Sequence, residues 1–456
     1  MAKRDRPVTQ SPIRRILQNT AWLLGGKGFG AICGIAYLAI LTRTLGLKNF
    51  GHFSLIFGTA QAIIAIAGVQ TWRAVVRYGS EHVHQKDWDK LGRLGLLCGV
   101  LDAVGAVFGC GLAAILIYGF AHKLDLNLAY IDLAFYFCCA SLWALVSAPT
   151  GIVRALHRFD MAVYVEAIVP LGRLLAALTI WATGPSVGRF LFAWALVDIL
   201  EAVLYWIMAR RLCPQAVRWE NFGKWRQTFA ENEGIGNFFL VTYASTTLDA
   251  GMRNGPLLAV GAFVSTRAAG IYRLATQLTQ SLSKLSTLLT RSVYAEVSRM
   301  RVASDAAEFR KLAFQTSVIA GLAGLVVVAI AYFAGKHLLA LIGGDDFEQG
   351  AAILVPLAIA ASFELAAVAF EPVLHSTGRA RFALLARLVA VGALAAAIFA
   401  LRDMGTIGIA WAVSIGGATG YVAMGIAALR ALNRREVEEA AALPRELLEA
   451  DPRQTD

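Results

Sequence analysis

The sequence predicts an all-α integral membrane protein, with about twelve transmembrane helices in two six-helix lobes around a central cavity. Hydrophobic residues make up 57% of the chain, charged residues only 16%, and the mean hydropathy is +0.60. Soluble domains average about 25% charged residues, so this composition excludes an ordinary soluble protein. The number of apolar segments and the placement of lysine and arginine between them then give the number of helices and their orientation.

Apolar segments long enough to cross a bilayer recur along the whole chain, since roughly 20 apolar residues cover the hydrocarbon core. The first segment is too long, and begins too far into the chain, to be a cleaved signal peptide. The twelve segments are 17–41, 50–70, 94–120, 128–150, 163–183, 187–209, 235–263, 268–290, 312–334, 351–374, 382–401 and 405–429.

Basic residues are concentrated in alternate loops. Pairs such as Arg14-Arg15, Arg210-Arg211 and Arg434-Arg435 lie on one side of the predicted membrane, and few basic residues lie on the other. The positive-inside rule therefore places both ends of the chain in the cytoplasm. The net charge of +11 is largely explained by this topology, so it does not indicate a nucleic-acid partner.

A polar stretch separates the first six segments from the last six. A weak repeat at an offset of about 220 residues supports two similar lobes with the binding site between them. It aligns Gly51, Leu55 and Gln61 with Gly270, Leu274 and Gln280. We therefore expect a cytoplasmic tail (1–16), an N-terminal lobe (17–210), a cytoplasmic linker (211–234), a C-terminal lobe (235–430) and a second cytoplasmic tail (431–456).

Charged residues inside the apolar segments need a reason, because a charge at the membrane centre costs a few kcal/mol. Lys27 lies among glycines in a first segment that has no acid. Its ammonium group either extends to the membrane surface or faces an internal aqueous cavity that holds an anion. In the seventh segment, Asp249 and Arg253 are four residues apart and so share one helical face.

The eighth segment has a polar stripe. Its members are three or four residues apart, which places them on one side of a helix: Arg273, Gln277, Gln280, Lys284, Thr287 and Arg291. Such a stripe faces either polar neighbours or water, since polar groups in hydrocarbon need partners. We predict a cationic cavity formed by Lys27, Arg253, Arg273 and Lys284. Its further polar or coupling groups are Gln277, Gln280, Asp249, Asp102 and Glu166.

The sequence contains none of the common catalytic or metal-binding motifs. It has no G-x-x-x-x-G-K-[ST] phosphate loop, no H-E-x-x-H, no C-x-x-C pair and no G-x-S-x-G. The histidines are scattered. We therefore expect a protein that is not an enzyme, with no catalytic residues, no bound metal and no cofactor.

One N-terminal pattern resembles a known family. Arg43-Thr44-Leu45-Gly46 is followed by a short turn and then by Asn49-Phe50-Gly51-His52-Phe53-Ser54-Leu55. This is similar to the start of Wzx-type polysaccharide and O-antigen flippases, in the multidrug/oligosaccharidyl-lipid/polysaccharide exporter superfamily. The hydropathy layout extends the resemblance to residues 12–432.

The resemblance implies a secondary transporter of the bacterial cytoplasmic (inner) membrane. Such a protein translocates polyprenyl-diphosphate-linked oligosaccharide for the synthesis of O-antigen, capsule or exopolysaccharide. Its partners would be this lipid-linked glycan, membrane lipids, and polysaccharide polymerase and chain-length proteins. The predicted cations would hold the diphosphate, and the acids would either pair with these cations or titrate during coupling.

Three alternatives remain open. A cation-coupled multidrug exporter of the same superfamily would bind cations through acids in the first or seventh segment, and here the first has a lysine and no acid. A lipid II flippase of this superfamily shares the substrate chemistry but resembles proteins with 14 spans. A membrane polysaccharide polymerase or glycosyltransferase resembles proteins with a large external loop or soluble domain, which we do not find in the sequence.

The predicted topology can be tested with reporter fusions. Because the basic loops alternate, a reporter fused after Gly350 should be active outside the cytoplasm and one fused after Gly223 should be active inside. Reporter activity on the same side for both fusions would contradict the predicted topology.

Overall fold

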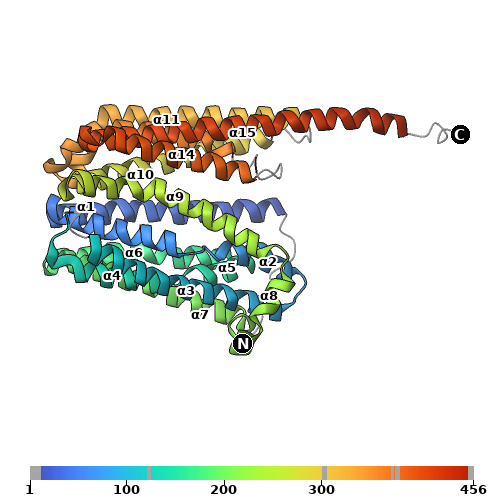
Figure 1. Ribbon diagram of the computed structural model, residues 1–456, viewed down its shortest axis with the longest axis horizontal. Coiled ribbons are helices and arrows are strands. Elements are labelled where there is room, and N and C mark those ends of the chain that lie inside the picture. Colours follow the sequence, from blue (N-terminus) through green and yellow to red (C-terminus); the bar gives the residue numbers. More distant parts are fainter. Residues whose placement is uncertain (1–11, 121–124, 300–305, 371–373, 375–379, 450–456) are drawn as a thin grey trace. The chain divides into compact units, whose positions relative to one another are not determined.

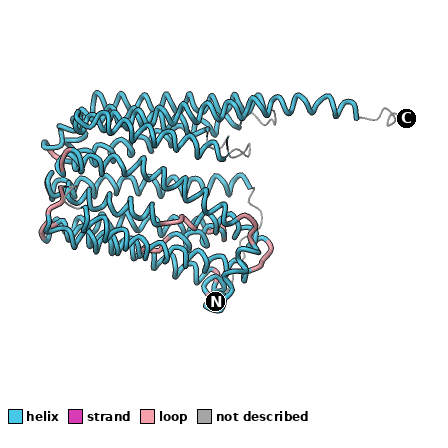
Figure 2. Tube along the Cα trace, viewed as in Figure 1, coloured by secondary structure: helices cyan, strands magenta, loops and turns pink. Residues whose placement is uncertain are grey.

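The computed structural model describes all of the chain except residues 1–11, 121–124, 300–305, 371–373, 375–379 and 450–456. The described residues are helical with short connections, and no strand occurs among them (Figure 2). The prediction of an all-α membrane protein is therefore confirmed. The chain divides into two compact units, Met1–Thr246 and Thr247–Asp456.

The described residues of the first unit form eight α-helices and the start of a ninth (Figure 1). They are α1 (Pro12–Ala67), α2 (Trp72–His84), α3 (Trp88–Phe120), α4 (Ile131–Trp143), α5 (Ser147–Ala155), α6 (Phe159–Thr183), α7 (Val187–Leu212), α8 (Trp225–Glu231) and the first turns of α9 (Ile235–Phe263). Short 3₁₀ helices are η2 (Leu128–Tyr130), η3 (Pro214–Val217) and η4 (Trp219–Lys224).

The second unit contains the rest of α9 and five further α-helices within its described part. These are α10 (Thr266–Arg299), α11 (Ala306–Gly343), α12 (Ala351–Ala366), α14 (Ala380–Leu401) and α15 (Gly405–Glu449). Three 3₁₀ helices accompany them: η5 (Asp345–Gly350), η6 (Ala367–Ala369) and η7 (Arg402–Met404).

Helix α1 is two antiparallel arms joined at Gly46. Gly46 has φ 69° and ψ 170°, a non-helical conformation that is almost restricted to glycine. The rings of Tyr37 and Phe53 lie 5.5 Å and 5.8 Å from the ring of Trp194 on α7. A continuous helix would separate Tyr37 from Phe53 by about 24 Å along its axis. The chain therefore reverses at Gly46, and each arm provides one of the first two predicted membrane crossings.

Each predicted segment coincides with a helix or a pair of helices in the described residues. Eight of these regions are long and apolar enough to cross a membrane by length and composition. Two of the eight, Gly30–Ala67 and Arg381–Leu432, each cover two predicted segments. Helices α9 and α10 are not among the eight, because the polar residues that the sequence analysis found in them lower their hydropathy.

The core of the first unit lies where α2, α3, α5 and α7 meet. Its buried members include Val75, Leu91, Ile152 and Tyr205. Gly151 permits this contact, because a Cβ at this position would lie 2.7 Å from the Cβ of Val75 and 2.9 Å from the Cα of Trp72. Helix α5 therefore packs directly against the backbone at the start of α2.

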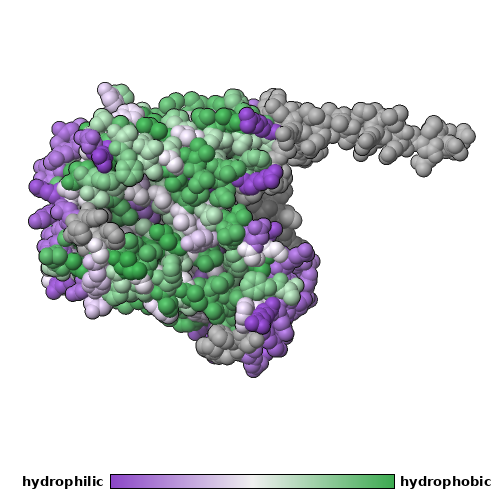
Figure 3. Space-filling model, viewed as in Figure 1, coloured by the Kyte–Doolittle hydropathy of each residue, from purple (hydrophilic) through white to green (hydrophobic). Residues whose placement is uncertain are grey.

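The outer surface of each unit is apolar along the middle of the helices. Large exposed side chains there include Val104, Leu200, Leu325 and Leu388. Figure 3 shows that hydrophilic residues gather toward the helix ends on the visible face. This is the surface expected of helices whose solvent is hydrocarbon rather than water.

The reversal of α1 gives a stability prediction. In Gly46→Ala, the new Cβ meets no neighbouring atom, but the positive φ is unfavourable for alanine by about 1–3 kcal/mol. We expect a lower melting temperature for the purified protein in detergent. Gly34→Ala is the control, because Gly34 is helical and a Cβ there would lie 3.9 Å from Tyr37, an ordinary contact. An unchanged melting temperature for Gly46→Ala would contradict the role assigned to this glycine.

Candidate functional site

The second unit contains a polar cavity of about 580 Å³ between α9, α12, α14 and α15. Such a volume is within the range of small-ligand sites in proteins. Its lining combines four charged side chains with apolar and aromatic ones: Asp249, Met252, Arg253, Phe363, Glu364, Ala367, Val368, Arg387, Ala390, Gly416, Gly417, Gly420, Tyr421 and Met424. The cavity is therefore able to receive a charged group and an apolar group together.

Glycines on α15 form one wall of this cavity. A Cβ at Gly417 would lie 3.3 Å from the backbone oxygen of Ala360 on α12, and one at Gly420 would lie 3.2 Å from the Cβ of Ala390 on α14. Helix α15 thus approaches both neighbours closely. The ring of Tyr421 lies 5.9 Å from that of Phe363, which adds an aromatic surface to the same wall.

The charges in the cavity are unevenly paired. Asp249 on α9 forms an ion pair with Arg387 on α14, with 3.2 Å between Oδ2 and Nη1. Arg253, one turn further along α9, is exposed and has no carboxylate within ion-pair distance among the described residues. Glu364 on α12 also lines the cavity. Glu364 interacts electrostatically with Arg253, but Arg253 forms no ion pair in the described part of the chain, so its guanidinium can still contact an anionic ligand.

The structure brings together two of the predicted site residues and adds two more. Asp249 and Arg253 share one face of α9 as their spacing predicted, but Asp249 pairs with Arg387 on another helix. Arg387 and Glu364 were not among the predicted site residues. Arg387 carried the same signal as Lys27, a single cation within an apolar segment (382–401), so the sequence could have indicated it.

The predicted cationic and amide residues on α10 are not among the described residues that line this cavity. On α10, Arg273 and Gln277 are half-buried, and Gln280 and Lys284 are exposed. Lys27 lies in α1, but its side chain is outside the described residues. Their assignment to a substrate cavity remains a prediction.

Asp102 on α3 caps another helix. Its carboxylate accepts hydrogen bonds from Oγ1 of Thr71 at 2.8 Å and from the backbone N–H of Ala148 at 2.9 Å. Ala148 belongs to the first turn of α5, where free N–H groups and the helix dipole favour a negative charge. Asp102 therefore connects α3, the start of α2 and the start of α5, and it is buried.

Two further acids of the first unit pair with arginines. Glu166 on α6 accepts a hydrogen bond from Nη2 of Arg154 on α5 at 2.7 Å. Asp198 on α7 accepts one from Arg173 on α6, also at 2.7 Å. In hydrocarbon such charges require partners, so both pairs join neighbouring helices.

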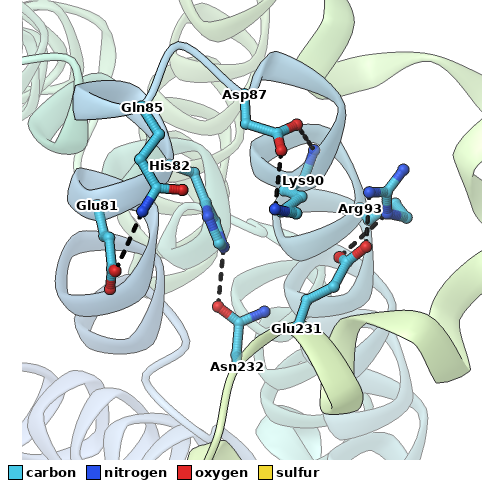
Figure 4. A network of polar contacts seen from close by, with 8 residues as sticks. All are labelled: Glu81, His82, Gln85, Asp87, Lys90, Arg93, Glu231 and Asn232. Atoms are coloured by element: carbon cyan, nitrogen blue, oxygen red, sulfur yellow. Dashed lines mark hydrogen bonds and ion pairs between the residues drawn. The ribbon is translucent and has the colours of Figure 1, made fainter.

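A polar network fixes the segment that follows α7 (Figure 4). Residues 211–234 contain η3, η4 and α8, all of which pack against α3. Arg93 binds Glu231 through two hydrogen bonds, of 3.1 Å from Nε and 2.6 Å from Nη2. His82 donates from Nε2 to the side-chain oxygen of Asn232 at 2.9 Å.

The same network contains Asp87, in the turn before α3. Its carboxylate lies 2.9 Å from Nζ of Lys90, and this hydrogen bond holds the pKa of Asp87 below its usual value. The carboxylate therefore remains ionised at neutral pH. The hydrogen bonds that Arg93 and His82 form in this network hold α8 and the residue that follows it against α3 and α2.

The fold and the polar sites define a class of protein, an all-helical membrane protein with the architecture of transporters of the MOP superfamily. One solved structure with this architecture is an inward-facing multidrug resistance MATE family transporter, with a TM-score of 0.67 and 15% identity over 89% of this chain and 95% of that one. Another is the lipid II flippase MurJ in an inward closed conformation, with a TM-score of 0.66 and 11% identity over 94% of this chain and 93% of that one.

The sequence match gives the family. Residues 16–301 match the polysaccharide biosynthesis protein family, and the chain belongs to this family. A relative from Escherichia coli (strain K12), the inner membrane protein YghQ, is 26% identical over 344 residues, which cover 74% of this chain and 94% of that protein. The resemblance to polysaccharide flippases, to which the N-terminal pattern pointed, is therefore confirmed. The chain is a multi-helical membrane protein of the polysaccharide biosynthesis protein family.

The ion pair in the cavity gives a further prediction. Arg387→Gln leaves Asp249 without its partner in a partly enclosed site, and removing one partner of a buried pair typically costs about 3–5 kcal/mol. The loss here should be smaller because the Asp249 side chain is 37% exposed. We expect Arg387→Gln to lower the melting temperature in detergent and the double variant Asp249→Asn, Arg387→Gln to recover part of the loss. Additive effects of the two substitutions would show that the pair contributes nothing to stability.

Proposed function

We propose that this protein is a secondary transporter that moves polyprenyl-diphosphate-linked oligosaccharide across the cytoplasmic membrane for the synthesis of a cell-surface polysaccharide. The observation that carries the proposal is the family match over residues 16–301. The inner-membrane relative supports a location in the cytoplasmic membrane, and the apolar helices support multiple crossings of it. The expected cytoplasmic location of both termini is part of the proposal, as are a polysaccharide polymerase and chain-length proteins as partners.

The cavity chemistry supports an anionic substrate. The guanidinium of Arg253 faces a space of about 580 Å³ and has no carboxylate within ion-pair distance in the described part of the chain. Arginine offers a diphosphate two parallel hydrogen bonds, which lysine does not. Met252, Val368 and Met424 line the same cavity and provide apolar contacts. We therefore assign the diphosphate to Arg253, with Lys27, Arg273 and Lys284 as further cations along its path.

The acids of the cavity must be considered in the main alternative function, that of a cation-coupled multidrug exporter, because such an exporter would bind cations through carboxylates. Asp249 and Glu364 are carboxylates that a cation would prefer, and the fold is also that of MATE transporters. However, Asp249 is bound by Arg387, and a cationic drug would lie close to Arg253. Glu364 lies near Arg253 and partly offsets its charge, so the preference for an anion over a cation rests on the family match and not on the net charge of the cavity.

The lipid II flippase alternative shares the diphosphate and therefore the same cationic contact. The fold does not separate the two, since MurJ has a TM-score of 0.66 with this chain. The two functions can be distinguished by the lipid-linked intermediate that accumulates when the protein is absent. A strain that lacks this protein should accumulate a polyprenyl-linked glycan in the inner leaflet and keep normal lipid II turnover. Accumulation of lipid II instead would support the alternative.

The assignment of the diphosphate to Arg253 can be tested by mutation. In a strain that lacks the chromosomal gene, Arg253→Ala should abolish export of the surface polysaccharide while the protein still accumulates in the membrane. Arg253→Lys should restore export in part, because the charge is kept and the paired hydrogen bonds are lost. Surface polysaccharide is measured with a specific antibody or lectin, and protein level by immunoblot of membranes.

Arg402→Ala is the matched control for this experiment. Arg402 is a half-exposed arginine of η7 that does not line the cavity, so its loss should leave export unchanged. The double variant Lys27→Ala, Arg273→Ala should also abolish export. Normal export by well-expressed Arg253→Ala and by this double variant would rule out the cationic site.

A further inference from the structure

Three arginines gather on aromatic rings where α2 and α5 meet in the first unit. The guanidinium carbon of Arg73 lies 5.5 Å from the centroid of Trp72, and that of Arg154 lies 4.8 Å from the same ring. Arg77, one turn after Arg73 on α2, lies 4.8 Å from the ring of Phe238. Aromatic faces attract cations but do not neutralise their charge. We call Trp72, Arg73, Arg77 and Arg154 the arginine–tryptophan cluster.

Acids neutralise only one of these three charges within the described residues. Arg154 is paired with Glu166 at 2.7 Å. Arg73 and Arg77 have no carboxylate within ion-pair distance in the same part of the chain, and the Nε–H of Arg73 is buried there without an acceptor. A buried donor without an acceptor carries a desolvation cost, which is larger for a charged group. The cluster thus has a positive charge and donor capacity that the protein itself does not use.

The backbone around the cluster is held in place. The N–H of Trp72 donates to Oγ of Ser147 at 3.1 Å, and the adjacent Thr71 donates to Asp102. Gly151 brings α5 against the Cα of Trp72, as described above. Trp72 and Arg154 therefore belong to helices whose spacing is fixed, and a ligand need not order them on binding.

We propose that the arginine–tryptophan cluster binds the diphosphate of an isoprenoid-linked donor, at a site separate from the cavity of the second unit. This rests on the proposed function and adds a second headgroup site to it. The predicted topology places residues 71–93 on the cytoplasmic side, which is the side from which the substrate would be collected. A diphosphate carries more than one negative charge and can accept hydrogen bonds from two guanidinium groups at once.

The test is a binding measurement on the purified full-length protein in an uncharged detergent free of phospholipid. The probe is geranyl diphosphate, a short isoprenoid diphosphate, measured by isothermal titration calorimetry. In an Arg253→Ala background, which removes the proposed cavity site, Arg73→Gln should weaken binding by about tenfold or more, because it removes charge-assisted hydrogen bonds. Arg73→Lys should bind with intermediate affinity. If Arg73→Gln does not fold, Arg77→Gln replaces it, since Arg77 is exposed and should not affect folding.

Arg226→Gln in the same background provides the matched control. Arg226 also follows a tryptophan and lies 5.3 Å from the ring of Trp225, but it is exposed on α8, away from the cluster. Its substitution should leave the affinity unchanged. An equal loss in Arg226→Gln and Arg73→Gln would mean that net charge alone attracts the probe, and the proposed site would be overturned.

Three other outcomes separate the site from the proposed function. Equal affinity of the Arg253→Ala protein with and without Arg73→Gln would overturn the site alone. Displacement of the probe by phosphatidylglycerol at the same concentration would also overturn it, because the cluster would then be a general site for anionic lipid headgroups. No binding of the probe by the wild-type protein would instead contradict the proposed function on which the site rests.

Discussion

The structure depends on one constraint, that a charge surrounded by hydrocarbon or packed helices needs a partner. Three pairs of charged groups inside the helices meet this constraint with a partner from another helix. Arg173 binds Asp198, Arg154 binds Glu166, and Arg387 binds Asp249. Each pair therefore joins two helices as well as satisfying two charges. Asp102 meets the same constraint without a cation, because hydroxyl and backbone N–H groups surround its carboxylate.

The constraint explains why the sequence could indicate the charged positions but not their roles. A charge in an apolar segment is visible in the sequence, and Asp249 and Arg253 were found in this way. The choice of partner depends on tertiary structure. Asp249 has Arg253 four residues away on its own helix, yet it pairs with Arg387, which lies more than 130 residues later in the chain. No spacing rule within one helix contains this information.

The fold was more predictable than the site. A long apolar segment indicates a membrane helix and the loop charges indicate its orientation, and both can be recognised from neighbouring residues in the sequence. The chain reverses at Gly46, the last residue of the Arg43-Thr44-Leu45-Gly46 pattern that follows the first apolar segment. The break between α4 and α5 was not predicted, since residues 128–150 form one continuous apolar run. That break creates the N-terminus of α5, and with it the position that Asp102 caps. The role of Asp102 could therefore not be read from hydropathy.

Pairing also separates cations that hold the fold from cations that can bind a ligand. Arg173 and Arg387 are bound by acids, so an anion that entered their sites would have to compete with a carboxylate already in place. Arg253 and Arg73 have no carboxylate within ion-pair distance among the described residues, although Glu364 lies near Arg253 in the cavity, and each arginine lies beside apolar or aromatic groups. A carboxylate competitor weakens anion binding, whereas a nearby aromatic face supports the cation without blocking its outward N–H groups. The two arginines that best suit a diphosphate are thus those that contribute least to joining the helices.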